Sequence, residues 1–148
     1  MKQVEAFEEV DAPPEVVWEV LLEFDSYPEW NPLVGSIEGL AVEADSLEVR
    51  IDLPGSHGGP FSLQRLVVEE HRRLAWLCRL LVPFAFDAYH EFRLEPIGDG
   101  RRTRLLQRET FRGALVPALL EEERVERGFR RLNEAVRERA ERRVGVTA

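Results

Sequence analysis

The chain has 148 residues, of which 44% are hydrophobic and 32% charged, a composition typical of a globular protein and unlike a disordered or fibrous one. This length fits one domain, which we expect to span residues 1–148. The net charge is −8, and the basic residues of the second half lie among acidic ones, which argues against a nucleic acid partner.

The first part of the chain predicts a strand, a helix and a short aromatic turn. Gln3–Val10 alternates as a strand does, and Asp11 is a candidate N-cap for a helix with Pro13 or Pro14 in its first turn. This helix should end before the segment Tyr27–Pro32, which we expect to form a short helical plug. The apolar face of the helix comprises Val17, Trp18, Leu21, Leu22 and Phe24.

Strand-like periodicity continues through the middle of the chain. The predicted strands are Ser36–Val42, Leu47–Leu53, Phe61–Glu70, Leu74–Leu81, Phe86–Ile97 and Thr103–Arg112. Their connections are too short for parallel crossovers, so neighbouring strands should pair antiparallel. The loop over residues 54–60 contains several glycines, and it is either a gate or a solvated hairpin turn.

A long helix is predicted near the C-terminus, from about Pro117 to Arg143. Glutamates gather at its start and arginines at its end, which suits the helix dipole. Its apolar stripe consists of Val125, Phe129, Leu132, Val136 and Ala140. Gly128 beside the stripe would allow either close packing on the sheet or space for a ligand.

The last two strands can be placed in register from the sequence. A short loop over residues 98–101 puts Glu91 opposite Arg108 and Glu95 opposite Arg104, and both pairs join opposite charges. The other face of this hairpin is apolar and should point inward.

Three polar residues interrupt that inward face. His90 lies opposite Glu109, and Gln107 lies one step along the strand. Buried polar groups need partners, so these side chains should contact one another, water or a ligand. His90 and Glu109 either form an acid–base pair or simply satisfy each other.

Several other kinds of site are not supported by the sequence. Cys78 is the single cysteine, so an internal disulfide is impossible, and its apolar surroundings predict a packed core residue. The three histidines lack metal-ligand spacing and no glycine-rich nucleotide motif occurs, so we expect neither a metal nor another cofactor. No apolar run is long enough to span a bilayer, so we expect no stable membrane insertion and a cytoplasmic location.

Three segments carry a resemblance to a known family. They are Ala12–Trp18, Tyr27–Pro32 and, in the last helix, Gly128-Phe129 with Leu132–Ala135. In these segments and in its order of elements the chain resembles the START/Bet v 1-like (SRPBCC) superfamily, and within it the bacterial polyketide cyclase/dehydrase and lipid-transport group. The resemblance implies an α+β helix-grip fold, in which a curved antiparallel sheet of about seven strands wraps around the long C-terminal helix. It also implies a cavity between sheet and helix.

Our leading hypothesis is that the chain binds or transports a small hydrophobic ligand, such as a lipid, polyketide or quinone. The expected apolar walls are Trp76, Phe86, Phe92, Phe111, Phe129 and Leu132, and the expected orienting groups are His90, Gln107 and Glu109. One alternative is an enzyme of the aromatase/cyclase type that uses His90 and Glu109 as acid and base. Another is a protein-interaction module with a residual pocket, and a homodimer also stays open.

Overall fold

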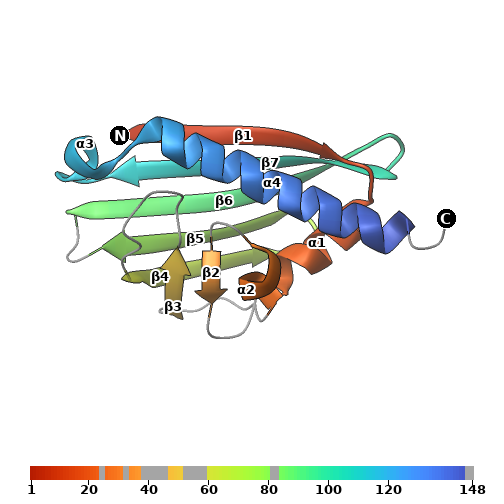
Figure 1. Cartoon of the computed structure of the whole chain (residues 1–148), viewed down its shortest axis with the longest axis horizontal. Coiled ribbons are helices and arrows are strands. Elements are labelled where there is room, and N and C mark those ends of the chain that lie inside the picture. Colours follow the sequence, from red (N-terminus) through yellow and green to blue (C-terminus); the bar gives the residue numbers. More distant parts are fainter. Residues whose placement is uncertain (24–25, 32–33, 38–46, 52–59, 81–83, 146–148) are drawn as a thin grey trace.

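The computed structural model describes residues 1–23, 26–31, 34–37, 47–51, 60–80 and 84–145, which form one antiparallel sheet and four helices (Figure 1). Seven strands pair in the order β1-β7-β6-β5-β4-β3-β2. They are β1 (Lys2–Val10), β2 (Val34–Ile37), β3 (Leu47–Ile51), β4 (Pro60–Glu69), β5 (Arg73–Leu80), β6 (Phe86–Ile97) and β7 (Arg102–Arg112). The helices are α1 (Pro14–Leu22), α2 (Tyr27–Trp30), α3 (Val116–Leu119) and α4 (Glu122–Gly145). The predicted α+β class and helix-grip arrangement are confirmed.

Helix α4 lies across one face of the sheet. It begins near α3 and the N-terminus, crosses β1 and β7, and ends against α1 (Figure 1). The short strands β2 and β3 lie at the opposite edge of the sheet, with α2 beside β2. The inner face of β5, β6 and β7 is therefore the face that looks toward α4.

The β6–β7 hairpin has the register that the sequence predicts. Glu91 pairs with Arg108 and Glu95 pairs with Arg104. Gly100, in the connecting turn, has a φ of 80°, a left-handed conformation that glycine adopts without steric cost. Because side chains alternate along a strand, this register decides which residues of both strands face α4.

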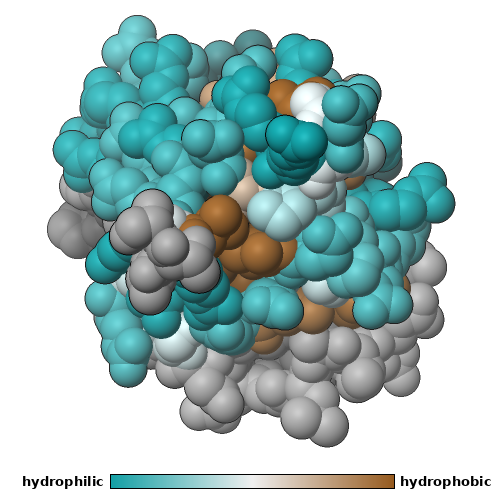
Figure 2. Space-filling view, turned by 90° about the vertical axis from the view of Figure 1, so that its right-hand side faces the viewer, coloured by the Kyte–Doolittle hydropathy of each residue, from teal (hydrophilic) through white to brown (hydrophobic). Residues whose placement is uncertain are grey.

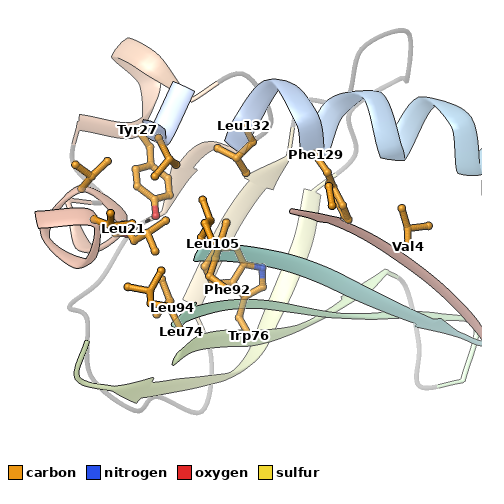
Figure 3. Close-up of a cluster of buried hydrophobic side chains, with 14 of the residues drawn as sticks. Val4, Leu21, Tyr27, Leu74, Trp76, Phe92, Leu94, Leu105, Phe129 and Leu132 are labelled. Carbon is orange, nitrogen blue, oxygen red and sulfur yellow. Dashed lines mark hydrogen bonds between the residues drawn. The ribbon is translucent and has the colours of Figure 1, made fainter. Parts of the chain in front are cut away.

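The hydrophobic core joins α4 to the inner face of the sheet (Figure 3). The stripe on α4 consists of Val125, Phe129, Leu132, Val136 and Ala140, all buried as predicted. The sheet contributes Leu74, Trp76, Cys78, Phe86, Ala88, Phe92, Leu94, Leu105 and Phe111. Burial of one large apolar side chain stabilises a fold by about 1.5–3 kcal/mol, so this layer holds the helix on the sheet.

The start of α1 differs from the prediction. Pro13, not Asp11, occupies the N-cap position, and the carbonyl of Pro13 accepts the backbone N–H groups of Val16 and Val17. Asp11 instead lies 3.4 Å from the guanidinium of Arg102, the first residue of β7. The cap prediction was wrong because Ala12 is fully buried, which draws the chain into the core before the helix begins.

The end of α1 and the aromatic plug agree with the prediction. Helix α1 ends at Leu22, before Tyr27-Pro28, and residues Tyr27–Trp30 form the short helix α2. The Tyr27 hydroxyl donates a hydrogen bond to the carbonyl of Leu21, and its burial raises the pKa of the phenol. Phe24 lies outside the described residues.

Parts of the predicted central strands also lie outside the described residues. The observed β2 and β3 confirm predicted strands 36–42 and 47–53 only over 36–37 and 47–51. The structure does not describe the rest of these predicted strands, which are residues 38–42, 52–53 and 81. It also does not describe residues 54–59 of the candidate gating loop.

The predicted continuous C-terminal helix is in fact two helices. Leu120 ends α3 with an extended ψ of 122°. Val116 and Val125 are both buried, yet residues nine positions apart lie on opposite sides of a straight α-helix, at about 100° per residue. A break between them lets both side chains reach the core.

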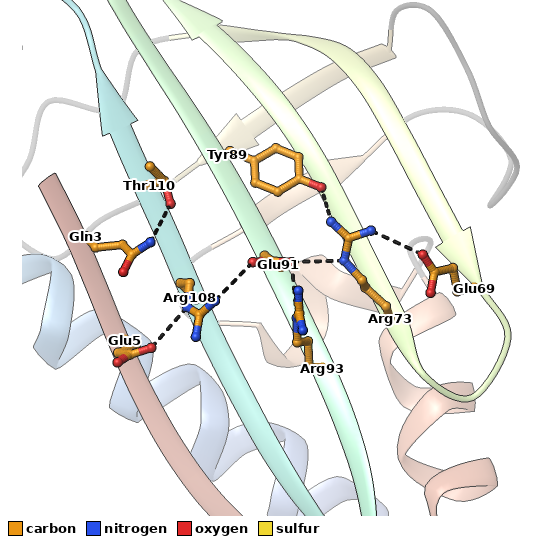
Figure 4. Close-up of polar contacts among 9 residues, drawn as sticks. All are labelled: Gln3, Glu5, Glu69, Arg73, Tyr89, Glu91, Arg93, Arg108 and Thr110. Carbon is orange, nitrogen blue, oxygen red and sulfur yellow. Dashed lines mark hydrogen bonds and ion pairs between the residues drawn. The ribbon is translucent and has the colours of Figure 1, made fainter. Parts of the chain in front are cut away.

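The outer face of the sheet carries a charged network centred on Glu91 (Figure 4). One carboxylate oxygen of Glu91 lies 2.9 Å from Arg73 Nε and 3.3 Å from Arg93 Nε. The other lies 3.7 Å from Arg108 Nη1. The network continues to Glu69, Tyr89 and Glu5. Three arginines cover this carboxylate, which leaves Glu91 only 6% exposed, whereas the sequence predicts only its pairing with Arg108.

This network gives Glu91 a measurable pH dependence. Burial by itself raises the pKa of Glu91, but the hydrogen bonds and charges of Arg73 and Arg93 outweigh it and hold the pKa below its usual value. A carboxyl whose pKa is lowered by folding contributes stability above its unfolded pKa of about 4.3, and that stability is lost as the pH falls through the folded pKa.

We therefore predict that Glu91→Gln lowers the free energy of unfolding at neutral pH by about 1–2 kcal/mol, since the arginines are partly exposed. The difference from the unaltered protein should shrink as the pH falls below about 4. Urea unfolding at several pH values measures this. The matched control is Glu95→Gln, an exposed position on the same strand, which should change stability by less than about 0.5 kcal/mol. A pH-independent loss in Glu91→Gln would contradict the prediction.

Candidate functional site

The candidate site is built from facing positions of three central strands. Trp76 on β5 pairs with His90 on β6, and His90 pairs with Glu109 on β7, so the three form one row across the sheet. The adjacent row on the same face contains Phe92 paired with Gln107. The sheet register thus brings the polar residues predicted from the sequence together.

His90 and Glu109 are in direct contact. His90 Nδ1 lies 3.0 Å from Glu109 Oε2, and the two side chains are only 2% and 8% exposed. A carboxylate carries no proton to donate, so Nδ1 carries the hydrogen and Nε2 is the remaining ring nitrogen. A buried carboxylate in this position fixes the orientation of the ring and stabilises an imidazolium if one forms.

Aromatic rings enclose His90 on several sides. The Trp76 ring stacks on the imidazole at a centroid distance of 5.1 Å and an angle of 13°. The rings of Phe92 and Phe129 lie 4.9 Å and 5.2 Å from it. His90 is therefore a polar group within an aromatic cage that spans sheet and helix.

Gln107 connects the sheet to α4. Its Nε2 donates to the backbone carbonyl of Phe129 at 3.1 Å and to Oδ1 of Asn133 at 2.8 Å. Both amide side chains are fully buried. The sequence analysis did not select Asn133 as a site residue, although it lies four residues after Phe129 and three before Val136, on the apolar side of α4. A polar residue within that stripe was the signal that could have found it.

Four buried polar atoms near this row have no hydrogen-bond partner among the described residues. They are Trp76 Nε1, His90 Nε2, Gln107 Oε1 and Asn133 Nδ2. The indole nitrogen of Trp76 points from the sheet toward α4 (Figure 3). An unpaired buried polar atom costs roughly 1–3 kcal/mol, so four of them in one region are unusual in a core.

The remaining predicted wall residues lie in the same layer but make different contacts. Phe86 and Phe111 lie farther along β6 and β7, where their ring centroids are 5.7 Å apart. Leu132 is fully buried on α4. The structure thus places all nine predicted site residues between sheet and helix, with the His90 cage and the Phe86–Phe111 pair as separate aromatic groups.

Cys78 lies on the same inner face, two residues beyond Trp76. It is buried and pairs with Ala88. Burial raises the pKa of the thiol well above its usual value, and the negative charge of Glu109 adds to this effect. A thiol without access to its thiolate form is a poor nucleophile, which agrees with a core role.

We predict that the Cys78 thiol resists alkylation in the native protein. Iodoacetamide at about pH 8 should label it on the order of 100-fold more slowly than in urea-unfolded protein, because only the opened state exposes a thiolate. Mass spectrometry of timed samples measures the rates. Equal rates in the two conditions would show an accessible thiol and contradict its placement in the core.

Two other features of the described residues bear on ligand binding. Among the described residues, no group of three or more histidine, cysteine, aspartate or glutamate side chains could hold a metal ion. A hollow at the end of α4 is lined by Glu138, Glu141, Arg142 and Gly145. This end of the molecule is mostly hydrophilic, with a small hydrophobic area near the middle of the face (Figure 2). A mainly charged hollow does not suit an apolar ligand.

Comparisons with known proteins agree with this architecture. A family model described as polyketide cyclase / dehydrase and lipid transport matches residues 1–145. The chain is similar to the solved structure of the Zhui aromatase/cyclase from Streptomyces sp. R1128, with 26% identity, 97% of this chain and 95% of that chain covered, and a TM-score of 0.73. No curated protein matches the chain.

Two further solved structures share the fold. A START superfamily protein from Mycobacterium smegmatis has 21% identity and a TM-score of 0.71, with 95% of this chain and 97% of that chain covered. A protein from Thermus thermophilus has 17% identity and a TM-score of 0.70, with 99% of this chain and 100% of that chain covered.

None of the described helices is long and apolar enough to cross a bilayer.

Proposed function

Since this chain belongs to the polyketide cyclase/dehydrase and lipid transport family, we propose that it binds a small hydrophobic molecule between the inner face of its sheet and α4. In this proposal the whole chain forms one domain, and the ligand binds within it. Its ligand is held by apolar walls and oriented by a few buried polar groups, the usual composition of a small-molecule site.

The observation that carries this proposal is a group of buried polar atoms that have no hydrogen-bond partner in the described part of the chain. Trp76 Nε1, His90 Nε2, Gln107 Oε1 and Asn133 Nδ2 lie among aromatic and aliphatic side chains. In a core that serves only stability, we would expect apolar atoms at these positions, or polar atoms paired with one another. A ligand that pairs with them recovers the desolvation energy, and binding is the function that this arrangement supports.

The predicted residues have two kinds of role in this proposal. His90, Gln107 and Glu109 orient the ligand, Glu109 by holding the His90 ring in place. The apolar walls are Trp76, Phe86, Phe92, Phe111, Phe129 and Leu132. Because the aromatic rings among these walls are flat and rigid, they favour a ligand with an extended apolar surface.

The test is native mass spectrometry of the purified protein, followed by extraction of any bound compound. We expect a co-purifying apolar small molecule, and a weaker complex in His90→Ala because an orienting group is lost, with a decrease in affinity of roughly tenfold. The exposed variant Glu95→Gln on the same strand serves as the control and should bind normally. Unchanged binding in His90→Ala would remove His90 from the site.

A second candidate function is catalysis of the aromatase/cyclase type. The 3.0 Å contact between His90 and Glu109 and the similarity to the Streptomyces aromatase/cyclase both favour it. His90 Nε2 would take a proton from a carbon next to a carbonyl group, and Glu109 would stabilise the imidazolium that results.

Glu109→Gln separates the two functions. An enzyme should lose turnover by roughly 100-fold or more while it still binds its substrate, since the glutamine keeps the shape but not the charge. A binding protein should show no turnover of a bound polyketide-like compound in either form. Product analysis by mass spectrometry, with binding measured in parallel, distinguishes these outcomes.

A further inference from the structure

We propose that the ligand is a neutral, flat molecule that carries a hydrogen-bond donor beside an acceptor, as a cyclic amide or a hydroxyl next to a carbonyl does. Gln107 and Asn133 bind this donor and acceptor through hydrogen bonds. The inference rests on the proposed binding function and specifies the chemistry of the ligand. It assigns to Asn133 a role in specificity.

The orientation of the Gln107 amide is fixed by the backbone. The carbonyl oxygen of Phe129 can only accept a hydrogen bond, and it lies 3.1 Å from the nitrogen of the Gln107 amide. That nitrogen must therefore be the NH₂ group. The oxygen of the same amide, Oε1, is left as a buried acceptor without a partner among the described residues.

The orientation of Asn133 follows from that of Gln107. The Gln107 NH₂ group also donates to Asn133 across 2.8 Å, so the Asn133 atom that it contacts must be the carbonyl oxygen. The Asn133 NH₂ group is then the buried donor without a partner among the described residues. One acceptor and one donor, held by neighbouring amides, match a ligand group that presents a donor and an acceptor side by side.

The next row of the sheet has two further buried polar atoms without a partner among the described residues. Trp76 Nε1 can only donate a hydrogen bond, and the facing His90 Nε2 is the ring nitrogen that Glu109 does not contact. Rows on one face of a strand repeat about every 7 Å. The Trp76 and His90 rings also stack nearly parallel, at 13°, beside Phe92, which suits a flat ligand.

The charges of the region favour a neutral molecule. No lysine or arginine is among the described residues that are buried, and His90 is already paired with the carboxylate of Glu109. A ligand carboxylate that moved from water into this region would find no free cation to pair with, so its desolvation would cost much free energy. Free fatty acids and other anions should therefore bind worse than neutral compounds of the same shape.

The experiment uses the full chain, stripped of bound compounds, with four bicyclic probes and a fifth, methylated control compound in calorimetric titrations. The probe 2-quinolinone has an N–H beside a carbonyl, whereas 1-methyl-2-quinolinone lacks the donor, naphthalene lacks both groups and 2-naphthoate is anionic. We expect 2-quinolinone to bind about tenfold more tightly than each of the others. The isomer 4-methyl-2-quinolinone keeps the N–H and should bind like 2-quinolinone, which controls for the bulk of the methyl group.

Variants test the residues. Asn133→Leu should lower the affinity for 2-quinolinone about tenfold and leave that for naphthalene unchanged. Glu134→Gln, an exposed neighbour on α4, should bind all probes normally. Thermal unfolding verifies that the variants are folded, and Asn133→Ala replaces Asn133→Leu if that variant is not.

The outcomes separate this inference from the proposed function. Equal affinities for 2-quinolinone, its N-methyl form and naphthalene would overturn the donor–acceptor inference, while binding of the bicyclic frame itself would still support the proposed function. Tighter binding of 2-naphthoate would overturn the expectation of a neutral ligand. If no probe binds, the inference fails, and the compounds extracted from the purified protein decide the proposed function independently.

Discussion

The pairing of β6 with β7 is the constraint on which the rest of the structure depends. It sets His90 against Glu109 on one face and Glu91 against Arg108 on the other. A shift of one residue would exchange the two faces, burying the charged pairs beneath α4 and exposing the aromatic residues. The opposite-charge pairs outside and the apolar residues inside both favour the same register, and this agreement makes the hairpin specific.

The two faces treat a buried carboxylate in opposite ways. On the outer face three arginines surround Glu91, and two of them, Arg73 and Arg93, outweigh the effect of burial and lower its pKa, so the charge is neutralised within the protein. On the inner face Glu109 contacts one histidine, and the other nitrogen of that ring has no partner among the described residues. The charges of the outer network are paired within the protein and stabilise the sheet, whereas the inner face has buried polar atoms without a partner among the described residues, with which the proposed ligand would pair.

Helix α4 closes the inner face and also contributes to its chemistry. Its apolar stripe holds it against the sheet, and the Phe129 carbonyl and Asn133 extend the polar row from β7 into the helix. A separate α3 allows this, because the break at Leu120 lets α4 follow the sheet while Val116 stays buried. The proposed ligand would therefore contact sheet and helix at once, and Asn133 would couple binding to the position of α4.

The sequence by itself determined the local and pairwise features. Periodicity identified the strands and the α4 stripe, and turn length with cross-strand charges fixed the β6–β7 register and so the meeting of His90 and Glu109. Only the tertiary structure decided the contacts between elements that are distant in the chain. The burial of Ala12 moved the N-cap from Asp11 to Pro13, the core on both sides of Leu120 divided the last helix, and the approach of α4 to β7 joined Asn133 to Gln107. No local pattern encodes such contacts, because they depend on how helix and sheet are placed in space.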